Sequence, residues 1–182
     1  MKNLLIVGGA TRNVGKTTFV VNLLKKFGKN SRIISLKIKT IYPDDNFFHG
    51  KDENPLKENE KYRIREINIT DNNQDAERML KAGAHTVIYI KSKIKYLEQA
   101  FNEFIKNADN NILIICESNS LRFVIKPAIY LFLKMNNTVE MKPSAEKLIN
   151  LADKVILSDG QKHDFNFNLL RVNEYSWQLL KE

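Results

Sequence analysis

The chain has 182 residues, of which 43% are hydrophobic and one is a cysteine, and its formal net charge is +8. This length and apolar content exclude a wholly disordered chain and allow one domain with a substantial core. We expect a cytoplasmic protein without a membrane partner. No apolar stretch is long enough to span a bilayer, no signal-peptide pattern follows Met1, and Cys116 alone cannot form an internal disulfide.

Short apolar runs alternate with helical patterns along the chain. This alternation predicts an α/β fold with a doubly wound, mostly parallel sheet between two layers of helices, and we expect residues 1–182 to form a single domain. The expected strands are 4–7, 32–37, 62–69, 86–90, 112–116, 128–133 and 154–157. The expected helices are 16–27, 74–81, 94–106, one that Ser144 caps, and a terminal helix within 174–182.

The first expected strand runs into a glycine-containing loop that ends at the first expected helix. Such a loop binds phosphate, because its N–H groups converge on the oxygens, Lys16 reaches the β- and γ-phosphates and Thr17 supplies a hydroxyl for Mg²⁺. Ala10 departs from the strict P-loop pattern, and a chance glycine-rich turn is the alternative interpretation. The loop residues predicted to bind the nucleotide are Gly9, Thr11, Arg12, Asn13, Val14, Gly15, Lys16, Thr17 and Thr18.

A long polar stretch, 40–61, follows two lysines at the end of the second expected strand. Lys37 and Lys39 are two residues apart and therefore point to the same side, where we expect them to meet the nucleotide phosphates or an anionic second substrate, unless they are simply solvated. A polar stretch of this length is typical of a binding loop or of a disordered segment. It leaves the sheet at the edge where open α/β sheets bind ligands.

Glu117 directly follows the apolar strand 112–116. Nucleotide hydrolysis needs a carboxylate near Mg²⁺ at such a strand end, so we predict that Glu117 holds the metal or orients water, with Lys16 as the second catalytic residue. Thr17 and Glu117 are the expected metal ligands, and Asp44 in the long loop is a further candidate. A surface or capping carboxylate is the alternative for Glu117.

The remaining chemistry-bearing residues show no pattern of a site. The three histidines and Cys116 lack metal-ligand spacing, which argues against zinc. The Lys and Arg residues are scattered and are not interleaved with aromatics, which favours a basic solvated surface over nucleic-acid binding.

In the order of its motifs the chain resembles the family of molybdopterin-guanine dinucleotide biosynthesis protein B. The resemblance rests on the loop end 15–18, the lysine-bearing segment 36–40, the segment 75–84 and Glu117. It implies a P-loop fold, GTP as ligand, a homodimer and an accessory role, with a cofactor-assembly protein as partner, in attaching a nucleotide to the molybdenum cofactor. The family's histidine-rich stretch is replaced here by 41–45, and its glycine after the late glutamate by Ser118.

The loop spacing from Gly9 to Gly15 is also similar to that of dethiobiotin synthetase, an ATP-dependent ligase. Three functions therefore stay open: an accessory NTPase, an ATP-dependent ligase or kinase acting on a small molecule, and a regulatory module that binds nucleotide without hydrolysis. GTP and ATP also stay open, because 157–160 lacks the Asn-Lys-x-Asp run of many guanine-binding proteins.

Overall fold

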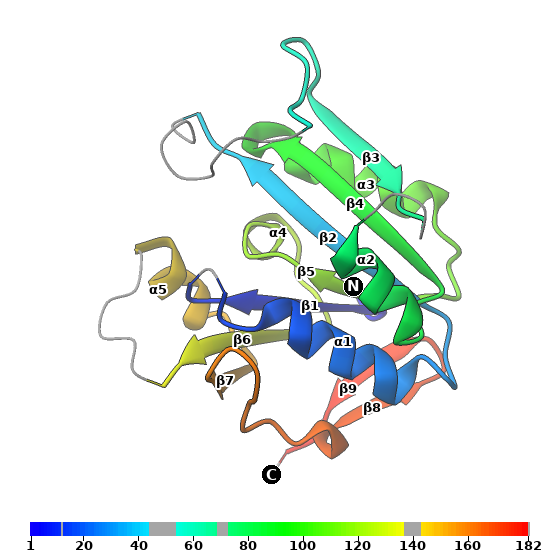
Figure 1. Cartoon of the computed structure of the whole chain (residues 1–182), viewed down its shortest axis with the longest axis vertical. Helices are drawn as coiled ribbons and strands as arrows, with labels where there is room; N and C mark the ends of the chain where they lie inside the picture. The colour runs from blue at the N-terminus through cyan, green and yellow to red at the C-terminus, as the bar shows by residue number, and fades with distance from the viewer. Residues whose placement is uncertain (12, 44–53, 69–72, 137–142, 182) are drawn as a thin grey trace.

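The computed structural model describes residues 1–11, 13–43, 54–68, 73–136 and 143–181. Its centre is a seven-stranded sheet in the order β3-β4-β2-β5-β1-β6-β7 (Figure 1). The strands are β1 (Leu4–Gly9), β2 (Ile33–Ile41), β3 (Tyr62–Glu66), β4 (Thr86–Lys93), β5 (Leu113–Glu117), β6 (Ile129–Met135) and β7 (Lys154–Ser158). β3 pairs antiparallel with β4, and the other neighbours pair in parallel. The predicted mostly parallel sheet is confirmed.

Helices cover both faces of the sheet, as a doubly wound fold requires (Figure 1). The helices are α1 (Lys16–Phe27), α2 (Gln74–Lys81), α3 (Leu97–Asn107), α4 (Leu121–Val124) and α5 (Pro143–Ile149), with short 3₁₀ turns η3 (Ile94–Tyr96) and η4 (Phe167–Leu169). β1 lies between the two layers and is buried along its whole length. Leu5 and Val7 face the core under α1 and α2, whereas Leu4 and Ile6 face the core under α3, α4 and α5.

Several predicted boundaries shift. The second strand continues to Ile41, so Lys37 and Lys39 lie within it and not at its end. The expected strand 62–69 ends at Glu66 and is an antiparallel edge strand, although buried Ile67 still donates its N–H to the carbonyl of Val87. The expected helix 94–106 begins as a 3₁₀ turn before α3. Apolar spacing locates an element better than its ends.

The predicted terminal helix is wrong. Residues after η4 form the hairpin β8 (Leu170–Asn173) and β9 (Ser176–Leu179), with Glu174 in the turn at a φ of 51°. Trp177 pairs in register with Val172, packs its ring 5.3 Å from that of Phe27, and donates its backbone N–H to the Lys2 carbonyl. Buried Trp177 beside exposed Gln178 fits the two opposite faces of a strand.

Within the described part of the chain, we find no helix with the length and apolar character needed to cross a bilayer.

Candidate functional site

The loop between β1 and α1, residues 10–15, opens at the carboxyl edge of the sheet beside the ends of β5 and β2. Gly15 precedes α1 with a φ of 89°, and a Cβ at this position would lie 2.8 Å from the carbonyl oxygen of Gly160. Glycine is therefore required here by both backbone conformation and space. No side chain caps α1 among the described residues, so its first N–H groups remain suited to an anion.

Lys16 folds back across this loop. Its Nζ donates a hydrogen bond to the carbonyl oxygen of Thr11 at 3.2 Å. Burial lowers the pKa of Lys16, and the nearby Glu117 carboxylate offsets part of that effect. Because its ammonium is largely withdrawn from water at the mouth of the loop, an anion bound there would gain a strong electrostatic partner.

Thr17 and Glu117 are brought together by the pairing of β1 with β5. The Thr17 hydroxyl donates to Glu117 Oε2 at 2.9 Å. Glu117 lies in register with Val7 on one side and Lys37 on the other, and its side chain is only 10% exposed. The structure therefore places a hydroxyl and a carboxylate side by side at the start of α1.

Lys37 is held between two carboxylates. Its Nζ lies 2.6 Å from Asp75 Oδ2 and 3.9 Å from Glu117 Oε2. Burial alone would lower the pKa of Lys37, but Glu117 and the hydrogen bond with Asp75 outweigh it, so the pKa is raised. Lys37 was expected to meet phosphate or a second substrate. In the structure it joins α2 to the carboxylate beside the loop.

The sequence interpretation missed Asn119 as a site residue. Its side chain accepts the N–H of Gly9 and donates to the carbonyl of Gly9, both at 2.8 Å. This pair of bonds fixes the end of β1, where the loop begins. The only sequence signal is that Asn119 follows Glu117 by two residues. Asp75 was also missed as a site residue, because only the folded chain shows that it reaches Lys37.

The other predicted loop residues have different environments. The Val14 side chain is buried in the core, so this residue can offer only its backbone to a ligand. Asn13 has a φ of 65°, and Thr18 is partly buried in the first turn of α1. Lys39 is exposed on β2. Arg12 and Asp44, predicted as a nucleotide contact and a metal ligand, lie outside the described residues.

A cavity of about 1340 Å³ extends from the loop across the sheet edge. Its walls include Thr11, Lys16 and Glu117, and it continues over β2, β4 and β3 and along α4. The volume exceeds what a triphosphate group alone needs, so the cavity has room for a further molecule beside the loop.

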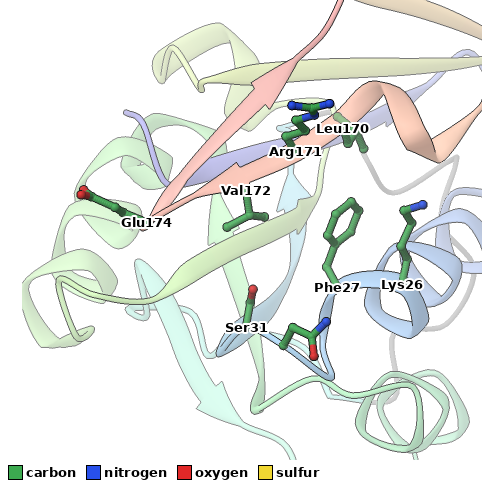
Figure 2. A pocket seen from close by; sticks show the side chains of 8 residues that line it. Lys26, Phe27, Ser31, Leu170, Arg171, Val172 and Glu174 are labelled. Carbon is green, nitrogen blue, oxygen red and sulfur yellow. The ribbon is translucent and has the colours of Figure 1, made fainter.

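A second hollow, of about 490 Å³, lies between the end of α1 and the hairpin (Figure 2). Figure 2 shows Phe27 extending from α1 toward the strand that carries Leu170 and Val172. α1 has 12 residues, so this hollow is about 18 Å along the helix from the loop. It has no part in the candidate site.

The donor set at the loop suits magnesium. Mg²⁺ prefers oxygen ligands and usually keeps water or phosphate in several positions, so one hydroxyl and one carboxylate, from Thr17 and Glu117, are an appropriate protein contribution. Across the described ranges no group of three or more His, Cys, Asp and Glu residues could hold a metal by itself. A metal held by Thr17 and Glu117 would take its remaining ligands from water or phosphate.

Comparisons of the chain with protein-family models, with curated proteins and with solved structures found no match.

Proposed function

We propose that the protein binds a nucleoside triphosphate with Mg²⁺ in the β1–α1 loop and hydrolyses it. The observation that carries this proposal is the hydrogen bond between Thr17 and Glu117 at the mouth of the loop that Lys16 crosses. A lysine, a hydroxyl and a carboxylate beside an uncapped helix N-terminus are the parts that phosphate binding and Mg²⁺ coordination require.

Each residue has a distinct role in this proposal. The backbone N–H groups from Gly15 to Thr18 bind phosphate oxygens, and Lys16 exchanges its bond with the Thr11 carbonyl for the β- and γ-phosphates. Thr17 and Glu117 would hold Mg²⁺, which neutralises charge on the phosphates when bound. Glu117 also orients the attacking water, while Lys37 keeps the carboxylate in position.

The choice of nucleotide base and the biological role are proposed from the resemblance to the family of molybdopterin-guanine dinucleotide biosynthesis protein B. This resemblance supports GTP, a homodimer and an accessory role in molybdenum cofactor assembly, and the single Cys116 supports a cytoplasmic location. ATP is the ligand if the protein acts instead as dethiobiotin synthetase does.

A ligase or kinase is a second candidate, and the size of the cavity favours it. About 1340 Å³ beside the loop allows a small molecule to bind next to the terminal phosphate. In that case phosphate release should be slow until an acceptor is added. A regulatory module would bind nucleotide and release no phosphate under either condition.

Phosphate release from GTP and from ATP, measured with Mg²⁺ and with EDTA, tests the proposal. We expect Mg²⁺-dependent turnover by the wild type, loss of it in Lys16→Ala, and normal turnover in Lys106→Ala, a control on exposed α3 surface. Turnover that Lys16→Ala leaves unchanged would contradict the proposed site.

A further inference from the structure

Five basic residues lie on one face of three adjacent strands. Strand pairing places Lys39 of β2 beside Lys91 of β4, and Lys91 beside Arg63 of β3. The neighbouring row is formed in the same way by Lys37, Tyr89 and Arg65. The residues between these rows belong to the opposite face, where Ile38, Ile64 and Ile90 pack under α3. We refer to Lys37, Lys39, Arg63, Arg65 and Lys91 as the basic patch.

Strand pairing brings basic residues directly opposite one another. Like charges directly opposite one another on neighbouring strands destabilise a sheet, and Lys91 has a like charge on both sides. Contacts within the chain reduce this repulsion: Lys37 pairs with Asp75, Arg63 pairs with Glu60, and Lys91 donates to the Asn54 carbonyl. A bound anion would interact favourably with all three basic residues of the row, Lys39, Lys91 and Arg63, at the same time.

The basic patch forms one wall of the large cavity. Among the described residues that line this cavity, six are basic, the five of the patch and Lys16, and one is acidic, Glu117. α4 supplies an apolar part of the lining, where Phe123 is 46% exposed and Val124 is 36% exposed. A ligand that suits both parts carries several negative charges at one end and an apolar body at the other.

We propose that the basic patch binds a second ligand, a small organic polyanion bearing carboxylate or phosphate groups, beside the nucleotide. The position of this second ligand next to the terminal phosphate of the nucleotide rests on the proposed function, whereas the binding of the ligand to the basic patch does not. Across its three strands the basic patch measures about 10 Å, and along each strand, between successive residues of the same face, it measures about 7 Å. These dimensions match a single molecule with a few charged atoms better than the repeating phosphates of a nucleic acid.

Titration with pyrophosphate in Mg²⁺ buffer tests this proposal with the full chain. The wild type should show two sites, of which Lys16→Ala removes the loop site and Lys91→Gln weakens the patch site at least about tenfold. The control Lys106→Gln, on α3, should keep both. Without ligand, Lys91→Gln should keep a cooperative thermal transition, so that weaker binding reports the lost charge and not an unfolded variant. Citrate should displace pyrophosphate from the Lys91-dependent site, and a 20-nucleotide single strand of DNA should not.

The outcomes separate the two proposals. A single site that depends on Lys16 would overturn the second-ligand site and leave the proposed function standing. A single site that depends on Lys91 would support the patch and contradict nucleotide binding in the loop. Equal weakening by Lys91→Gln and Lys106→Gln, or displacement by the DNA strand, would indicate a general basic surface and overturn the patch as a small-molecule site.

Discussion

Glu117 accepts a hydrogen bond from the hydroxyl of Thr17 at 2.9 Å, although the two residues are 100 positions apart in the chain. The contact exists because β5 pairs in parallel with β1 and sets Glu117 level with Val7, eight residues before the loop reaches Gly15. Sheet register thus brings the carboxylate to the loop that α1 follows. A metal and a phosphate can then share one small site.

Glu117→Gln should separate binding from hydrolysis. The glutamine keeps an oxygen that can accept the hydrogen bond from the Thr17 hydroxyl. It lacks the negative charge that would bind Mg²⁺ and orient the attacking water. We expect hydrolysis to fall at least about 100-fold, while binding of a non-cleavable analogue changes far less. Parallel turnover and binding assays measure both effects. The control is Glu98→Gln in the first turn of α3, and unchanged hydrolysis in Glu117→Gln would remove the carboxylate from the mechanism.

Gly15→Ala should destabilise the fold by about 1 to 3 kcal/mol, because alanine is strained at a φ of 89° and its Cβ would meet the Gly160 carbonyl. Urea unfolding measures the change. Asn13→Gly, in the same loop at a φ of 65°, should alter stability by less than about 1 kcal/mol, because glycine accepts that conformation readily. Equal losses of stability in Gly15→Ala and Asn13→Gly would contradict a requirement for glycine at position 15.

The pair Lys37–Asp75 should stabilise the protein in a pH-dependent way. The pKa of Lys37 is raised above its ordinary value of 10.5, since Glu117 and Asp75 outweigh burial. The contribution is therefore fully present below pH 10.5 and is lost as the pH rises through the higher folded-state pKa. Asp75→Asn should cost about 1 kcal/mol at pH 7, and its unfolding curve should approach that of the wild type above pH 10.5.

The exposed pair Lys81–Glu77 on α2 is the matched control for that measurement. Glu77→Gln should cost less than about 0.5 kcal/mol, because an exposed pair in successive helical turns contributes little. If Asp75→Asn lowers the free energy of unfolding no more than Glu77→Gln does, the pair Lys37–Asp75 stabilises the protein no more than an exposed pair.

His163 should make stability fall in mild acid. Its ring packs 4.8 Å from Phe19 and 4.9 Å from Phe167, and burial lowers its pKa below the ordinary 6.5. As the pH drops through 6.5 the unfolded chain takes up this proton before the folded chain does, so the free energy of unfolding decreases. His163→Leu should flatten this decrease in urea titrations between pH 7.5 and 5. Parallel curves of unfolding free energy against pH for the wild type and His163→Leu would show that His163 does not cause the loss of stability in acid.

Local sequence patterns predicted much of the fold because they reflect local physics. The helix 16–27 matched α1, since its apolar spacing and the preceding loop both act over a few residues. The buried strand before Glu117 was visible as an apolar run bounded by polar residues. In contrast, Trp177 and Leu180 have helical spacing by coincidence. Only the pairing of β9 with β8 reveals a hairpin.

The parts of the site that sequence could not predict depend on contacts between distant segments. Asp75 reaches Lys37 because α2 packs against β4, the neighbour of β2. Asn119 forms hydrogen bonds with Gly9 because β5 is the neighbour of β1. The basic patch requires the register of three strands, one of which runs antiparallel to the others. Residue spacing contains no information about such registers.

Calorimetric titration with Mg²⁺ and non-cleavable analogues of GTP and ATP tests the central claim most directly. We predict binding of one analogue per chain to the wild type, with at least tenfold weaker binding to Lys16→Ala and unchanged binding to Lys106→Ala. No heat of binding for either analogue, or equal affinity in the wild type and Lys16→Ala, would contradict a nucleotide site in the loop between β1 and α1.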